Sequence, residues 1–93
     1  MALVRISRHL RRFFPAYPDK GEVVDVITVA AAVEMIEARH PGLGFYIVDE
    51  HKTLRHHVNI FVGQDLVSDR QLSDPIDDSS TIDVIPALSG GFQ

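Results

Sequence analysis

The feature that most constrains the fold is one well-delimited helix pattern in residues 28–40. The hydroxyl of Thr28 can accept a hydrogen bond from an amide of a first helical turn. Pro41 and Gly42 end the pattern, because proline cannot continue a helix and glycine tolerates a positive φ. Between these limits an apolar residue recurs at i, i+3, i+4 and i+7, at Val29, Ala32, Val33 and Ile36. This stripe predicts one main helix that packs on a core.

Around this helix lie short segments with the composition of β-strands. Residues 2–7 alternate with a period of two, and the other segments are rich in valine, isoleucine and aromatic side chains. We expect strands over residues 2–7, 22–27, 45–48, 54–62 and 82–85. The predicted fold class is therefore α+β, a mixed sheet of four to five strands covered on one face by one main helix at about residues 28–40.

Two connections are predicted to pack on the core without being strands. Residues 69–80 are rich in aspartate and serine and contain a proline, so we expect a loop that Leu72 and Ile76 pin to the core. Residues 9–14 have the pattern of one helical turn before Pro15. The apolar residues expected to face inward from this turn are Leu10, Phe13 and Phe14.

The composition excludes several classes of function. The chain has 93 residues and no cysteine, so it has no disulfide framework, no thiolate metal ligand and no cysteine nucleophile. Its apolar runs are far shorter than the ~20 residues of a membrane span, and it has no signal-peptide pattern. His51, His56 and His57 are close in sequence, but strand neighbours point to opposite faces, so no metal site is expected. We expect a cytoplasmic protein with no membrane partner that is not an enzyme.

The net charge of −4 is unevenly distributed. Residues 1–20 hold five basic residues and one aspartate, whereas residues 64–83 hold six aspartates and one arginine. Because opposite potentials speed encounter and orient partners, an acidic region beside the C-terminal tail would suit a basic partner. The basic segment lacks spaced aromatic stacking residues, so no nucleic-acid partner is expected.

The sheet is expected to leave one face without a helix. In the last two predicted strands, Phe61 and Ile85 have the opposite parity to the buried positions, so they would lie on that face or under a loop. Exposed apolar residues grouped on one face usually mean contact with another molecule. Pro86 ends the last strand because it has no backbone donor. We predict a partner-binding face made by Phe61, Ile85 and Pro86.

Three stretches of the sequence resemble the MoaD/ThiS group of ubiquitin-like sulfur carriers, which includes the small subunit of molybdopterin synthase. They are residues 58–63 (Val-Asn-Ile-Phe-Val-Gly), residues 69–74 (Asp-Arg-Gln-Leu-Ser-Asp) and residues 81–91, which run through a strand and a proline to Ser-Gly-Gly. The resemblance implies a β-grasp fold over residues 1–88, a flexible tail over residues 89–93, and the role of a protein cosubstrate.

The resemblance also implies the chemistry of the tail. In this group the C-terminal glycine carboxylate attacks the α-phosphate of ATP inside an E1-like adenylating enzyme, and sulfur then displaces AMP to leave a thiocarboxylate. Gly91 would be that glycine, while Leu88, Ser89 and Gly90 thread a narrow channel of the partner, where residues without a Cβ fit best. ATP is used by the partner, and no cofactor is expected on the chain. A sulfur-accepting enzyme of a cofactor, amino-acid or secondary-metabolite pathway would act downstream.

The chain departs from this pattern because Phe92 and Gln93 follow Gly91. Some sulfur carriers resemble it in carrying two extra residues that a JAMM-type metallopeptidase removes. We hypothesise that the bond between Gly91 and Phe92 is cleaved and that the precursor is inactive. Two other functions stay open: a ubiquitin-like modifier conjugated through Gly91, and a non-catalytic β-grasp binding module.

Overall fold

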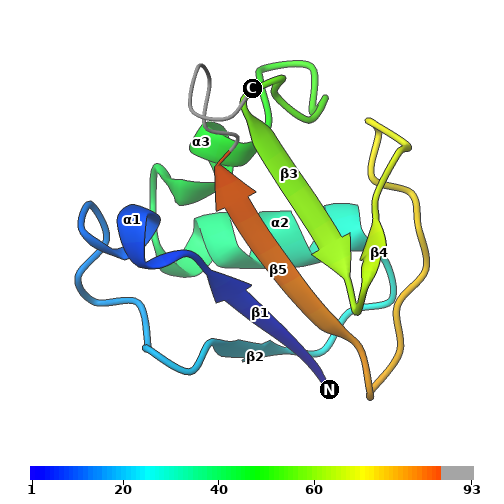
Figure 1. Cartoon of the computed structure of the whole chain (residues 1–93), viewed down its shortest axis with the longest axis horizontal. Helices are drawn as coiled ribbons and strands as arrows, with labels where there is room; N and C mark the ends of the chain where they lie inside the picture. The colour runs from blue at the N-terminus through cyan, green and yellow to red at the C-terminus, as the bar shows by residue number, and fades with distance from the viewer. Residues whose placement is uncertain (87–93) are drawn as a thin grey trace.

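The first and last strands lie side by side at the centre of the sheet (Figure 1). In the computed structural model, which describes residues 1–86, β1 (Ala2–Ile6) pairs in parallel with β5 (Thr81–Pro86). β2 (Glu22–Val24) flanks β1, and β3 (Val58–Val62) and then β4 (Asp65–Leu66) flank β5, all by antiparallel pairing. The order β2-β1-β5-β3-β4 gives a five-stranded mixed sheet and confirms the predicted fold class.

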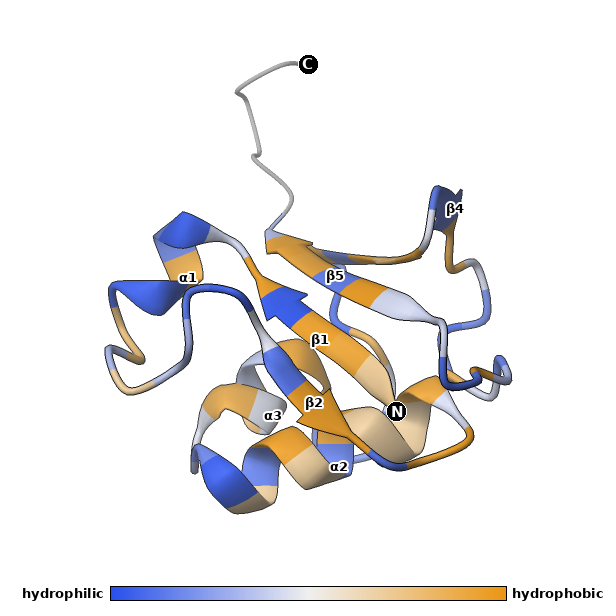
Figure 2. Cartoon of the chain, turned by 90° about the horizontal axis from the view of Figure 1, so that it is seen from below, coloured by the Kyte–Doolittle hydropathy of each residue, from blue (hydrophilic) through white to orange (hydrophobic). Residues whose placement is uncertain are grey.

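The main helix, α2 (Val29–Arg39), forms where the apolar stripe predicts it. The Thr28 hydroxyl accepts a hydrogen bond of 3.1 Å from the Ala31 amide, as expected of an N-cap. The four stripe residues are all buried. Figure 2 shows α2 and α3 on the same side of the sheet, so one sheet face is covered and the other is left without a helix.

One helical turn, α1 (Arg8–Arg11), follows β1, and it corrects one prediction. Leu10 is fully buried and Phe14 is half-buried, but Phe13 is 66% exposed. Leu10 and Phe14 are four residues apart and share the inward side. Phe13 shares the outward side with His9, whose ring lies 5.8 Å from it in an edge-on arrangement.

The predicted strand over residues 45–48 is wrong, because residues 45–47 belong to a helix, α3 (Leu43–Ile47), and Val48 follows it in extended conformation. The Glu37 carboxylate on α2 accepts hydrogen bonds from the amides of Gly42, Gly44 and Phe45, at 2.8 to 3.3 Å, and so caps the start of α3. These hydrogen bonds lower the pKa of Glu37, and the bond from the Gly42 amide has the largest effect. A short apolar run has no period that separates strand from helix, and here the distant cap decides.

β2 and β3 are shorter than predicted, β5 is longer by one residue at each end, and the long acidic loop is where it was expected. β3 starts only at Val58, while Leu54 makes an isolated bridge to Val48. β2 ends at Val24, which leaves Ile27 exposed. Leu72 and Ile76 are buried, which confirms that they pin the loop over residues 69–80. None of the helices in residues 1–86 has the length and apolar character of a membrane span.

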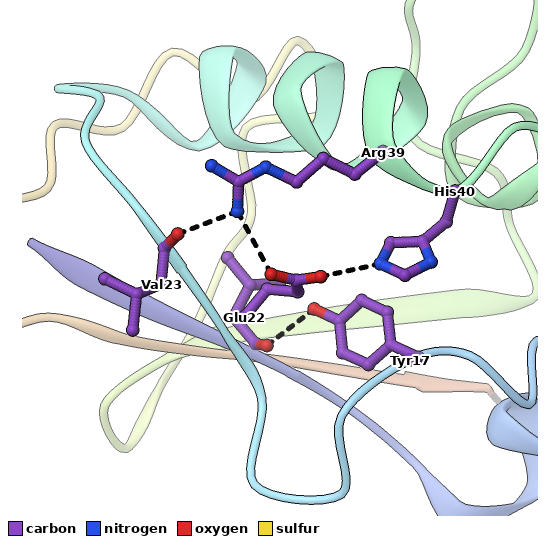
Figure 3. Close-up of polar contacts among 6 residues, drawn as sticks. Tyr17, Glu22, Val23, Arg39 and His40 are labelled. Carbon is purple, nitrogen blue, oxygen red and sulfur yellow. Dashed lines mark hydrogen bonds and ion pairs between the residues drawn. The ribbon is translucent and has the colours of Figure 1, made fainter.

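A cluster of polar groups ties β2 to the end of α2 (Figure 3). The Glu22 carboxylate contacts His40 Nε2 at 2.7 Å and an Arg39 guanidinium nitrogen at 3.1 Å, and that nitrogen also donates to the Val23 carbonyl at 2.8 Å. The contact with His40, helped by Arg39, lowers the pKa of Glu22. The carboxylate therefore stabilises the fold only while it is ionised.

Tyr17 extends this cluster to β1. Its hydroxyl donates a 2.6 Å hydrogen bond to the Val4 carbonyl, and its ring lies 4.7 Å from that of His40. Burial raises the pKa of Tyr17, so the hydroxyl keeps the proton that it donates. The long connection between α1 and β2 is thereby fixed to the sheet.

We expect Glu37→Ala to lower the free energy of unfolding by about 1 kcal/mol, because the first amides of α3 lose their acceptor. Glu34→Ala is the matched control, since Glu34 is exposed on the same helix, and it should change that free energy by less than about 0.5 kcal/mol. Urea denaturation followed by circular dichroism measures both. Equal effects of the two substitutions would contradict the capping role.

Glu22→Gln should make the fold less sensitive to acid. Because the folded pKa of Glu22 lies below its ordinary 4.5, the stabilisation it gives is present above about pH 4.5 and is lost as the pH falls through the folded pKa. The variant should therefore be less stable than the wild type at neutral pH, with a difference that shrinks towards about pH 3. Thermal unfolding across this range tests it, and a difference independent of pH would refute it.

Candidate functional site

Two of the three predicted partner-binding residues, Phe61 and Ile85, lie on the sheet face opposite α2, whereas Pro86 has the parity of the buried Val84. Ile85 is 41% exposed, Phe61 is half-buried, and Pro86 is the last residue of β5. In the β3–β5 register Ile85 is opposite Asn59 and Phe61 is opposite Asp83. Because alternate residues of a strand point to the same face, Phe61 and Ile85 share the outer face while Ile82 and Val84 are buried. The contact role of these residues stays a prediction.

Two further exposed apolar residues on this face, Leu66 and Val23, were not predicted. Leu66 on β4 is 56% exposed and pairs with Phe61, and Val23 on β2 is exposed and pairs with Leu3. β4 has only two residues, which is too short for a periodic pattern, so the sequence alone did not reveal Leu66 as part of the face. We call the residues Phe61, Leu66 and Ile85 the outer-face cluster.

An ion pair occupies the middle of the outer face. Arg5 and Asp83 are opposite each other in the parallel register, and the guanidinium donates to both carboxylate oxygens, at 2.6 and 2.9 Å. The hydrogen bond with Asp83 raises the pKa of Arg5. Asp83 is also opposite Phe61, so the row across the sheet runs from charged to apolar. Such a surface combines apolar area for binding with a charged pair that can orient a partner.

Of two surface cavities in the described part of the chain, one lies next to the predicted binding face and the other lies away from it. A shallow one of about 410 Å³ lies at the end of β5, with Ser7, Arg11, Asp83 and Ile85 among its lining residues. A larger one of about 550 Å³ lies between α2, α3 and the loop after α3. Of the predicted site residues within 1–86, none lines the larger cavity.

The predicted reaction site itself lies outside the described residues. This applies to the adenylation and thiocarboxylate residue, to the cleavage site and to the tail residues, namely Leu88, Ser89, Gly90, Gly91 and Phe92. The structure does place the end of β5 at Pro86, and it shows which elements surround that point. Since β1 and β5 are parallel, both strands end at the same edge of the sheet, and the Ser7 amide donates to the Val84 carbonyl there at 3.1 Å.

The charge prediction was wrong about which sign lies at this edge. Asp77 and Asp78 precede β5, so they lie at its beginning, and the amino group of Met1 contacts Asp78 there at 2.9 Å. β5 has six residues and ends with Pro86, so its two ends lie about 17 Å apart. The element at the end of β5 is instead the basic turn α1. Proximity in sequence to the C-terminus was misleading because a strand carries the chain away from the loop that precedes it.

Comparison with known proteins agrees with this architecture. The family model of the ThiS family matches residues 4–91. The chain belongs to the ThiS family. A comparison with curated proteins finds no significant match.

Solved structures show the same fold as this ThiS family member. A chain of the Amycolatopsis orientalis BexX/CysO complex matches with a TM-score of 0.82 and 26% identity, over 98% of this chain and 100% of that one. Mycobacterium tuberculosis CysO matches with a TM-score of 0.80 and 24% identity, over 95% and 100%. SAMP1 from Haloferax volcanii matches with a TM-score of 0.77 and 19% identity, over 97% and 98%.

The family match and these structures confirm the MoaD/ThiS-type β-grasp. At family level the chain is a ubiquitin-like sulfur carrier or modifier.

The Arg5–Asp83 pair should be weakly coupled in the free protein. Because both side chains are partly exposed, we expect a double-mutant cycle with Arg5→Gln and Asp83→Asn to give a coupling of about 0.5–1 kcal/mol in the free energy of unfolding. The coupling should fall as salt is added. Urea titrations of the four proteins measure it, and a coupling of zero at low salt would contradict the bidentate contact.

Proposed function

We propose that this protein is a sulfur carrier whose reactive terminus is Gly91, exposed when Phe92 and Gln93 are removed. The observation that supports it most directly is the extent of the family match, which ends at Gly91 and leaves the last two residues outside. Because the family model ends at Gly91, a reaction at the Gly91 carboxylate agrees with the match. Phe92 and Gln93, which lie beyond the match, would then be an extension that is removed.

The reaction uses the main chain instead of a side chain. A carboxylate is a poor electrophile, so it must be activated first. The Gly91 carboxylate attacks the α-phosphorus of ATP in an E1-like partner and pyrophosphate leaves, which gives an acyl adenylate. A sulfide sulfur then attacks the carbonyl carbon and AMP leaves, which gives the thiocarboxylate. A downstream enzyme accepts that sulfur.

The precursor cannot be adenylated at Gly91. While Phe92 follows it, Gly91 has an amide carbonyl in place of a carboxylate, and an aromatic side chain follows the glycines. Hydrolysis of the bond between Gly91 and Phe92 by a JAMM-type peptidase would release the dipeptide and expose the Gly91 carboxylate. Residues without a Cβ at positions 90 and 91 allow the tail to pass through a narrow channel.

The outer-face cluster supports a role in partner docking. Ile85 lies beside the end of β5, while Phe61 and Leu66 lie level with Asp83 in the middle of that strand. The Arg5–Asp83 pair continues this row onto β1. The Amycolatopsis orientalis CysO structure shows CysO in complex with another protein, BexX. By analogy, this chain would bind partner enzymes through the outer-face cluster, next to the edge where β5 ends.

ATP–pyrophosphate exchange with the E1-like enzyme encoded in the same genome tests the proposal. A chain that ends at Gly91 should support exchange, whereas the full-length chain should not. A chain that ends at Gly90 is the matched control, because it exposes a glycine carboxylate one residue too early, and it should be poorly active. Equal exchange with the full-length chain would refute the need for processing.

The same reaction distinguishes the two activities open to this family. If the enzyme supplied with sulfide returns the carrier with one carboxylate oxygen replaced by sulfur, the sulfur-carrier function holds. If Gly91 instead becomes joined to lysine side chains of other proteins, the protein is a modifier.

A further inference from the structure

Exposed basic side chains gather at the edge of the sheet where β5 ends. α1 begins where β1 ends, and its Arg8, like Arg12 just after it, is exposed and makes no ion pair with another residue in 1–86. Lys20 is exposed in the turn that enters β2. Because β2 is antiparallel to β1, this turn lies at the same edge as α1. We call Arg8, Arg12 and Lys20 the basic rim. Figure 2 shows the hydrophilic α1 beside the end of β5.

The opposite edge of the sheet is acidic. Asp25 follows the end of β2, and Asp77 and Asp78 precede β5, all exposed. The register places this end of β2 beside Ala2, and the Leu3 amide bonds to the Ser80 carbonyl, so these aspartates lie around the start of β1 and β5. The molecule thus has opposite charges at the two ends of β5.

The fold itself does not require the basic rim. Arg11 has a structural role, since it donates to the Ile6 carbonyl at 3.1 Å and lies 3.6 Å from Asp19. Arg8 makes no comparable contact, and it is the first residue of α1, where the positive end of a helix disfavours a cation. Exposed charges that local stability does not explain point to interaction with another molecule.

We propose that the basic rim docks on an acidic surface of the partner protein that receives the C-terminal tail, and that the charge polarity turns the end of β5 towards that partner. An acidic surface attracts the basic rim and repels the aspartates at the other end, which favours one orientation at encounter. The cavity beside Ile85 is lined by Ser7, Arg11 and Asp19, each of which is next in sequence to a rim residue. Apolar contact on the outer face and charge contact on the rim would therefore form one surface. This proposal rests on the proposed function, since the partner is the protein that takes up the tail.

The first test compares two charge variants in the adenylation assay. Arg8→Gln with Arg12→Gln removes two positive charges at the rim, and Gln64→Glu with Ser68→Glu, both exposed in the β3–β4 region, makes the same change in net charge elsewhere. With Gly91-ended chains at low salt, the rim variant should raise KM for the carrier about three- to tenfold with kcat unchanged. The difference should shrink as salt is added. An unchanged KM, or an equal rise in the control, would overturn the proposal.

A second test does not depend on the proposed function. Titration of ¹⁵N-labelled full-length protein with a deca-glutamate peptide should shift the amide signals of α1 and of the turn around Lys20, and the rim variant should lose these shifts. Shifts elsewhere, or none, would overturn the assignment, and so would tighter binding of a DNA duplex at equal charge, which would make nucleic acid the partner. If the Gly91-ended wild type is not adenylated, the proposed function fails while this titration still decides whether the rim binds an acidic protein segment.

Discussion

The parallel pairing of β1 with β5 is the constraint on which the rest of the structure depends. It joins the first and last described strands in the sheet, so both strands have a neighbour on each side. It places Arg5 against Asp83 across 78 residues of sequence. Closing so long a loop costs conformational entropy, which the buried residues of both strands must offset. Because the pairing is parallel, both strands end at the same edge of the sheet, and this is its most important consequence.

That edge gathers the features relevant to function. β5 ends there at Pro86, α1 begins there, and Ile85 of the outer-face cluster lies next to it. The covered face of the sheet supplies stability through α2 and α3, so the open face can keep exposed apolar side chains without loss of the core. The residues that stabilise the fold and the residues proposed to contact partners therefore lie on opposite faces of the sheet.

The sequence was sufficient to predict elements set by local patterns, and it failed where distant residues decide. The helix over residues 28–40 was predicted because its cap, stripe and stop lie within the segment. The segment 45–48 was not, because its helix depends on Glu37, which belongs to another helix.

The composition of the site shows the same division. Parity within each strand placed Phe61 and Ile85 on the open face. The Arg5–Asp83 pair, the contribution of Leu66 and the sign of the charge near the end of β5 all follow from strand order and direction, which no local pattern contains.

The proposed reaction takes place at Gly91, and the described domain is the part of the protein that partner enzymes would bind. The most direct test is the intact mass of the protein isolated from its native cell under conditions of sulfur demand. The account predicts a chain that has lost Phe92 and Gln93 and that carries, in a fraction of molecules, sulfur in place of one oxygen at Gly91. A population that retains both residues and shows no sulfur at its terminus would contradict it.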